Sequence, residues 1–463
     1  MTRDHVASRA RASAVCLLAA AGLLGACDPG SSEVDGGAGS DSGACAPVTV
    51  AVPGEAVVDV TGCGATLALD APRVLELWTE GAALEIDGGP RRFDAGSHDV
   101  PVSGAATLHV RDLGPPPGEV AIDRSLAWTD AALLDDPSVV GLDRLMRTLS
   151  GEAHPGRLLD AFFRRFGTTA HSERLGPQRL LEDQIASQGA DPTAWDLDAF
   201  PFRVTGVHNR IDLADGAHCG ELRVSLASTH PLHQPFHLIF LYRQAPSEAD
   251  VSPDGTAHCA ATALRWARLS DATEDDFRDS ARAILDEALV AEGFLVLETV
   301  EFIISPWEWR QWFLEPGPTL ENRPLFQTVD TERLNRPGSD RDDFLAWVSD
   351  NAEDIDARRI LIPERFRAAS ARVNDGVPWI PLDLGGLAAL DAYPDLRRQL
   401  EIVGCPACHA TDADFVQTLP DRTFSPFYAR ELDARVAHLL DRGVGVYALA
   451  PHGPLQRDPA LPP

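Results

Sequence analysis

Residues 204–213, Val-Thr-Gly-Val-His-Asn-Arg-Ile-Asp-Leu (VTGVHNRIDL), decide the fold because they open a run of predicted strands. Apolar stretches at residues 222–226 and 237–242 predict two more strands, and residues 294–304 predict a fourth. A helix is predicted before the fourth strand from apolar residues at helical spacing, which are Phe277, Ala281, Ile284, Leu285, Ala288 and Leu289. Strands before and after a helix predict an α+β core domain over residues 201–315.

The regions on either side of this core domain make the predicted fold class multidomain. Period-two apolar runs between Gly, Pro and Asp clusters predict a small N-terminal β-sandwich-like domain over residues 45–114. Residues 119–200 are predicted to be helical, and residues 316–463 are predicted to form a mainly helical C-terminal region. The apolar residues that predict the first helices are Leu142, Leu145, Met146, Leu149, Leu158, Leu159, Phe162 and Phe163.

The first 27 residues carry the features of an export signal in order. Three arginines precede an apolar run at residues 14–24 that is too short to span a bilayer as a stable helix. The run ends in Leu-Gly-Ala-Cys at residues 24–27, which resembles the lipobox of bacterial lipoproteins. The resemblance implies a signal peptide over residues 1–26, lipidation of Cys27 and a place in the bacterial cell envelope, periplasmic or at the cell surface. An ordinary signal peptide, or a short anchor with a chance cysteine, is the alternative.

The composition limits what the chain can bind. Residues 27–44 are mainly Gly, Ser, Asp and Ala and predict a flexible stalk behind the lipid. The whole chain has 40 basic and 70 acidic side chains, a net charge of −30, so we expect neither nucleic acid nor an anionic lipid surface as a partner. The sequence contains no lysine, which excludes a Walker A lysine, a Schiff-base lysine and a Ser-Lys dyad. No dinucleotide glycine fingerprint is present either, so we expect no nucleotide.

The cysteines beyond the leader and the lipidation site are Cys45, Cys63, Cys219, Cys259, Cys405 and Cys408. An even number of cysteines outside the cytoplasm suggests disulfides. We propose Cys45–Cys63 and Cys219–Cys259, because each pair would close a short loop. This pairing leaves Cys405 and Cys408 free, although a disulfide between these two would also balance the count.

Residues 405–409 read Cys-Pro-Ala-Cys-His and have the CxxCH form that resembles the haem attachment motif of exported c-type cytochromes. The resemblance implies that Cys405 and Cys408 bind haem c through thioether links and that His409 is a metal ligand to the iron. The methionines of the chain are Met1 and Met146, and none follows the motif. We therefore expect a histidine as the sixth ligand, or five-coordinate iron. His438, on a predicted helix over residues 428–442, lies off the apolar face of that helix.

Two other interpretations of the same motif stay open. If residues 400–403 form a strand, the motif would begin a helix and resemble a thioredoxin-like oxidoreductase, which is a thiol–disulfide redox protein. The motif could instead be a structural disulfide or half of a zinc site in a non-enzymatic surface binding or structural lipoprotein. The haem interpretation predicts an electron-transfer or redox protein that is anchored to a membrane by lipid and meets a redox partner protein.

A wider resemblance covers residues 200–415. The segment His208-Asn209-Arg210-Ile211-Asp212-Leu213, the later Cys219-Gly220-Glu221, Cys259, Ser305-Pro306-Trp307 and a C-terminal CxxCH are similar to a group of large exported bacterial lipoproteins. That group is uncharacterised, so the resemblance implies an architecture and no activity.

Further polar and aromatic clusters are candidate sites. On an extended strand His208, Arg210 and Asp212 share one face, which predicts an Arg–Asp ion pair beside a hydrogen-bonded histidine, or else a polar site. Glu298 and Glu301 are expected on opposite faces of a strand, which excludes an acid–base pair from that strand alone. His230, His233 and His237 could bind Zn²⁺ or Cu²⁺, although Pro231 and Pro235 indicate a loop. Trp307, Trp309 and Trp312 are expected in the core or at a sheet rim rather than in a sugar-stacking surface.

Overall fold

The computed structural model describes part of the chain. The described residues are 48–439 except for 53–55, 62–63, 82, 85–88, 119, 152, 169–174, 232–235, 302–306, 326–327, 358–359, 375–376, 379, 403–416, 426–427, 429–431, 433–434 and 437–438. The chain divides into two compact units, Met1–Cys45 and Ala46–Pro463, and everything below concerns the second unit. Within the described residues, no helix combines the length and the apolar character that crossing a bilayer requires.

Residues 48–114 form two small sheets around a shared apolar core, and we call this part the β module. The three-stranded sheet has the order β1 (Val48–Val52), β3 (Ala65–Leu69), β6 (Gly96–Val100). The four-stranded sheet has the order β2 (Ala56–Thr61), β7 (Ala105–Gly114), β4 (Arg73–Glu80), β5 (Arg91–Phe93). Alternate residues of both sheets, among them Leu67, Leu77, Leu108 and Val110, bury their side chains in one cluster, as period-two patterning requires.

The main structural element is a nine-stranded sheet, which we call the central sheet. Its order is β16 (Val377–Pro378), β15 (Ala371–Asn374), β13 (Trp307–Glu315), β12 (Phe294–Glu301), β11 (Phe236–Arg243), β10 (Glu221–Ser228), β9 (Phe202–Arg210), β8 (Ala127–Trp128), with β14 (Thr319–Arg323) paired to β13. Each of these strand pairs is antiparallel. The strands predicted at residues 204–213, 222–226 and 237–242 correspond to β9, β10 and β11.

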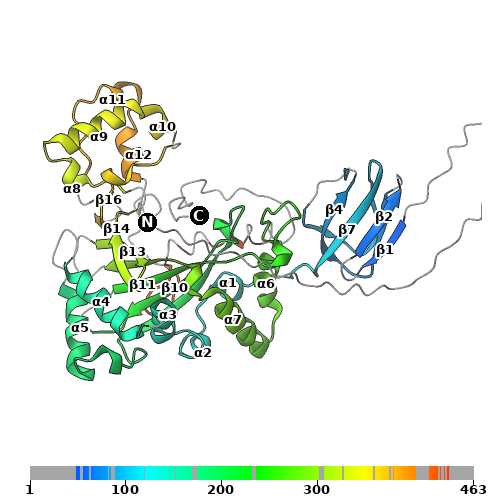
Figure 1. Ribbon diagram of the computed structural model, residues 1–463, viewed down its shortest axis with the longest axis horizontal. Helices are drawn as coiled ribbons and strands as arrows, with labels where there is room; N and C mark the ends of the chain where they lie inside the picture. The colour runs from blue at the N-terminus through cyan, green and yellow to red at the C-terminus, as the bar shows by residue number, and fades with distance from the viewer. Residues whose placement is uncertain are drawn as a thin grey trace, which may run out of the picture. The chain divides into compact units, whose positions relative to one another are not determined.

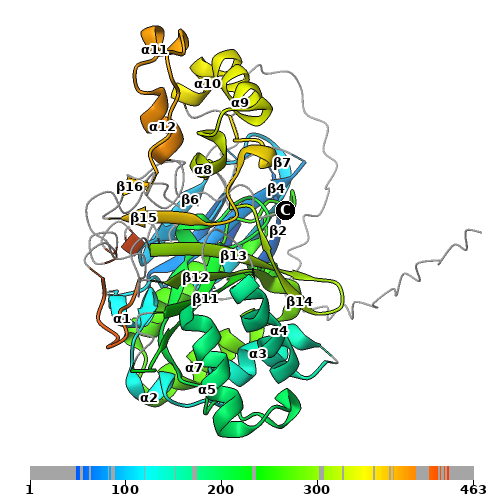
Figure 2. The same ribbon diagram turned by 90° about the vertical axis from the view of Figure 1, so that its left-hand side faces the viewer.

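Helices gather on one side of the central sheet (Figures 1 and 2). They are α1 (Ile122–Ser125), α2 (Ala131–Leu134), α3 (Leu142–Ser150), α4 (Pro155–Thr168), α5 (Leu175–Gln188), α6 (Ala260–Arg268) and α7 (Glu274–Ala288). The predicted apolar faces of α3, α4 and α7 enter one large core with the sheet residues Leu222, Phe240 and Trp312. Short 3₁₀ turns η1 (Pro192–Ala194), η2 (Ile211–Leu213), η3 (Glu248–Asp250), η4 (Leu269–Asp271) and η5 (Ala291–Gly293) join these elements.

A second helical group follows the strands β13 and β14. It contains α8 (Thr331–Leu334), α9 (Ser339–Asp350), α10 (Ala352–Asp356), η6 (Glu364–Phe366), α11 (Ala389–Ala392) and α12 (Leu396–Ile402). These elements enclose their own apolar cluster around Phe344, Val348 and Leu396. The described residues at 428, 432, 435, 436 and 439 have helical backbone, and Tyr428, Leu432 and Leu439 are buried in the large core.

The fold class predicted from the sequence is wrong. The region after residue 315 was predicted to be mainly helical, but β14, β15 and β16 lie there and extend the central sheet. The sheet also takes β8 from the region predicted to be helical, so its strands come from residues 127–378 rather than from residues 201–315 alone. The strands β8 and β16 have two residues each, which is too short for an alternating apolar pattern to reveal them.

Candidate functional site

The residues predicted to carry haem and lipid lie outside the described part of the chain. They are Cys27, Cys405, Cys408 and His409, together with the predicted disulfide partners Cys45 and Cys63, with His233 and with His438. The predictions made for these residues therefore stay predictions. The structure does describe the segments that precede and follow residues 403–416.

The segment before the motif is helical. Residues Leu396–Ile402 form α12, so residues 400–402 are helical and do not form the strand that the thioredoxin-like interpretation would require. Leu396 and Leu400 are 0% and 2% exposed in the cluster around Phe344. Both side chains therefore pack inside this cluster.

The segment after the motif is held against β9. Thr418 and Phe424 form a β-bridge, and Arg422, in a left-handed backbone conformation (φ +71°), lies between them. The buried Arg422 guanidinium donates to Asp135 Oδ1 at 2.5 Å and Oδ2 at 3.1 Å, and to the Val204 carbonyl at 3.0 Å. The hydrogen bond from Arg422 lowers the pKa of Asp135, so this ion pair persists in mild acid.

His208 on β9 contacts this segment directly. Its Nδ1 lies 3.3 Å from the Tyr428 hydroxyl, and its Nε2 lies 3.4 Å from Thr418 Oγ1. The side chain is 0% exposed, and the tyrosine ring meets the imidazole edge-on with centroids 5.2 Å apart. Burial lowers the pKa of His208 well below its usual value, and Arg435, Arg223 and Arg210 lower it further. The imidazole is therefore neutral at physiological pH.

Arg210 and Asp212 form the predicted ion pair. Arg210 Nε and Nη2 donate to the Asp212 carboxylate at 3.0 and 2.9 Å, and both side chains are under 10% exposed. Asp212 lies in the turn η2 rather than on the strand, because β9 ends at Arg210. Burial raises the pKa of Asp212, but Arg210 and the nearby Arg435 outweigh burial, so its pKa lies far below the usual range. A bidentate buried pair of this kind is structural.

The strand register places further polar groups on the same face of the central sheet as His208. Arg223 lies opposite His208, Glu221 lies opposite Arg210, and Glu298 lies opposite Gln311. Arg223 Nη2 donates to Glu221 at 2.7 Å, and Gln311 Nε2 donates to Glu298 at 3.1 Å. We call these residues, with His208 and Arg210, the polar face.

Glu298 is the unusual member of the polar face. Although the residue is half-buried, protein surrounds its carboxyl group, and this burial raises its pKa in spite of the nearby Arg223 and the bond from Gln311. Thr299, the next residue, bonds to Trp312 in the core, and Glu301 is 0% exposed. Glu298 and Glu301, an odd number of positions apart on β12, therefore lie on opposite faces, as predicted.

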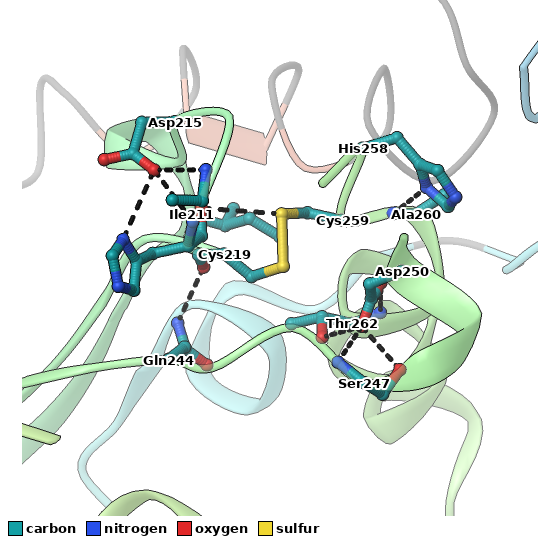
Figure 3. Close-up of a disulfide and its surroundings, with 12 residues drawn as sticks. Ile211, Asp215, Cys219, Gln244, Ser247, Asp250, His258, Cys259, Ala260 and Thr262 are labelled. Carbon is teal, nitrogen blue, oxygen red and sulfur yellow. Dashed lines mark hydrogen bonds and ion pairs between the residues drawn. A yellow bond between two sulfur atoms is a disulfide. The ribbon is translucent and has the colours of Figure 1, made fainter. Parts of the chain in front are cut away.

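The predicted disulfide Cys219–Cys259 is present, with the two Cα atoms 5.2 Å apart (Figure 3). Both cysteines are 0% exposed and pack with Ala214 and Ala257. Backbone bonds from Cys219 N to the Gln244 carbonyl and from Gln244 N to the Gly220 carbonyl fix the first cysteine. Gly220 has φ +82°, and a Cβ there would lie 2.3 Å from the Arg210 carbonyl oxygen, so only glycine fits after Cys219.

Asn209, within the segment at residues 204–213, belongs to a buried hydrogen-bond network that the sequence did not reveal. Asn209 Nδ2 donates to the Ser125 carbonyl, and Asn209 Oδ1 accepts from Ile211 N and from Gln244 Nε2. Gln244 Oε1 in turn accepts from Trp266 Nε1 at 2.9 Å. These bonds join β9, the end of β11 and α6. The residues of segment 208–221 that form these hydrogen bonds therefore have a structural role in the described part of the chain.

The described residues of the remaining candidate clusters do not gather into one site. His230 Nε2 lies 2.9 Å from Asp183, whereas His237 is 1% exposed on β11. Among the described residues, no group of three or more His, Cys, Asp or Glu side chains could hold a metal ion. Trp312 is 0% exposed and packs on Phe162 and Phe166. Trp307 and Trp309 occupy the opposite face of β13, so the tryptophans form no common surface.

The comparisons with known proteins found no match. No protein-family model, no curated protein and no solved structure matches this chain.

Proposed function

We propose that this protein is an exported bacterial lipoprotein, anchored through Cys27, that carries a c-type haem on Cys405 and Cys408 with His409 as an iron ligand. The CxxCH motif is the observation that carries the proposal. Two thiols and an imidazole are the donor set that covalent haem requires, and the bound group would supply one-electron transfer. The partner would then be a redox protein of the same compartment.

The Cys219–Cys259 disulfide supports the proposed location outside the cytoplasm. Disulfides persist in oxidising compartments outside the cytoplasm, and a c-type haem motif is expected in an exported chain. Because Cys219 and Cys259 pair with each other, neither competes for Cys405 or Cys408.

The burial of Met146 supports the expectation that no methionine binds the iron of the proposed haem. Met146 lies on α3 and is 0% exposed in the large core. Its thioether could reach an iron atom only if the packing of this core rearranged. A haem bound through Cys405 and Cys408 would then be held by His409 together with a second histidine, or by His409 alone.

A second candidate is a non-enzymatic binding or structural lipoprotein in which Cys405 and Cys408 form a disulfide. The polar face favours this candidate, because its Arg223–Glu221 pair resembles a structural ion pair and not a poised reactive group, as does the pair that its Arg210 forms with Asp212 of the turn η2. Both candidates share the lipid anchor and the envelope location.

A pyridine haemochrome spectrum separates the two candidates. The chain is produced with a cytochrome c maturation system, and the expected result is the absorbance of c-type haem. Cys405→Ser with Cys408→Ser should abolish this absorbance, whereas the matched control Pro406→Ala keeps CxxCH intact and should retain it. A wild-type protein without haem absorbance refutes the proposal, and thiol counting then distinguishes a fixed disulfide from a thiol redox pair.

A further inference from the structure

Cys259 lies between two residues that contact the β module. His258 Nε2 lies 3.4 Å from Glu76 Oε1 of β4. Ala260, the first residue of α6, is 1% exposed in an apolar cluster with Val74 and Leu113 of the β module. The backbone angles of Cys259 therefore set the direction of two docking contacts at once.

Glu76 is the centre of this docking interface. It is 1% exposed and accepts hydrogen bonds from Arg111 Nη1 and from Ser252 Oγ, each at 3.0 Å. Arg111 also donates to the carbonyls of Glu248 and Val251, at 3.4 and 3.1 Å. These contacts of the β module fall within residues 244–262, which we call the disulfide loop. Farther along α6, Arg268 Nη2 adds a bond to the Leu113 carbonyl at 2.7 Å.

One residue of the disulfide loop, Cys259, has a disfavoured backbone conformation. Cys259 has φ +64°, in the left-handed region that residues other than glycine rarely adopt. Hydrogen bonds also hold the loop, because Asp250 accepts from Ser247 and from both the backbone and the hydroxyl of Thr262. Cys259 itself donates its backbone N–H to the Asp250 carbonyl at 3.3 Å. The bond to Cys219 is the covalent restraint on the disfavoured residue (Figure 3).

We propose that the Cys219–Cys259 disulfide is a redox-sensitive lock on the docking of the β module. A dithiol reduces it: two electrons and two protons convert the S–S bond to two thiols, and the dithiol becomes a disulfide. Cys259 then leaves the left-handed region, and His258 and Ala260 move away from Glu76 and Val74. The lock does not depend on haem, so it stands apart from the proposed function.

Thermodynamic reciprocity gives the first test. If docking and the disulfide are coupled, weakening the interface must favour reduction by the same factor. The full-length protein is equilibrated with dithiothreitol, and the thiols of Cys219 and Cys259 are quantified by alkylation and peptide mass spectrometry. Glu76→Gln should shift the reduction equilibrium toward the thiols by about fivefold or more. The matched control Glu80→Gln changes an exposed residue of the same strand and should leave it unchanged. An unchanged equilibrium in Glu76→Gln overturns the proposal.

A pair of disulfide-free variants gives the second test. Cys219→Ala with Cys259→Ala removes the restraint, whereas Cys219→Ala with Cys259→Gly removes it but tolerates a positive φ. Hydrogen exchange in β4 and β7 should rise in the first variant and return toward the wild-type value in the second. Equal exchange in the two variants and the wild type contradicts the lock. If the alanine variant does not fold, the glycine variant is compared with the wild type alone. Faster hydrogen exchange in its β4 and β7, while β10–β12 stay protected, would contradict the claim that the disulfide acts by holding residue 259 at a positive φ.

Discussion

Replacing the buried His237 with glutamine should make the central sheet markedly less sensitive to acid. His237 is 1% exposed on β11, and burial lowers its pKa from 6.5 to about 3. Above pH 6.5 the imidazole is neutral in both the folded and the unfolded chain, so it contributes no pH dependence there. Between pH 6.5 and 3 the unfolded chain binds a proton that the folded chain refuses, and stability is lost as the pH falls.

The size of this loss follows from the two pKa values. At pH 5 the protonated form of an unfolded histidine exceeds the neutral form about thirtyfold. This excess favours unfolding by about 2 kcal/mol. Near pH 3 the loss approaches about 5 kcal/mol, since each pKa unit is worth about 1.4 kcal/mol. His237→Gln removes the titrating group, so its free energy of unfolding should fall between pH 8 and pH 5 by about 2 kcal/mol less than that of the wild type.

Guanidinium unfolding at pH 8 and pH 5 measures this difference. Fluorescence reports on the central sheet, because Trp128, Trp266 and Trp312 are buried in its core. His98→Gln, in β6 of the β module, controls for the loss of one imidazole. A pH dependence in His237→Gln equal to that of the wild type would refute the assignment of a neutral, desolvated imidazole to β11.

Three further changes test other parts of the structure. Arg422→Met removes the bonds to Asp135 and Val204, which should destabilise the segment after the motif by about 1.5–3 kcal/mol and raise hydrogen exchange at residues 417–425. Glu298→Gln removes a carboxyl that the folded chain holds protonated to a higher pH than the unfolded chain does. Its gain in stability over the wild type should therefore grow as the pH rises from 4 to 7 in urea unfolding, and no such growth counts against the raised pKa. Met146→Leu should leave the absorbance and reduction potential of the haem form unchanged, and a changed iron spectrum would show methionine ligation.

Local patterns predicted the elements whose signal lies within one stretch of sequence. The strands β9, β10 and β11 carry long apolar runs, and α3, α4 and α7 carry apolar residues at helical spacing. The Cys219–Cys259 pair was predicted because an even number of cysteines outside the cytoplasm suggests disulfides and because this pair closes a short loop.

The features that the sequence did not predict depend on contacts between residues that lie far apart in the chain or in different elements. The strands β8 and β16 exist only because neighbouring strands offer hydrogen bonds, and two residues hold no periodic signal. Asp212 leaves the strand because its carboxylate pairs with Arg210 in a turn, which alternation does not reveal. The bonds of Asn209 to Ser125 and Gln244 join three elements, so the role of Asn209 follows only from the folded sheet.

The intact mass of the exported protein, produced with a cytochrome c maturation system, tests the central claim most directly. The proposed function predicts a mass increased by one covalently bound haem, retained after denaturation and absent from the variant with serine at residues 405 and 408. A wild-type mass without haem, lowered instead by the two hydrogens of a Cys405–Cys408 disulfide, would contradict the haem proposal and favour the structural lipoprotein.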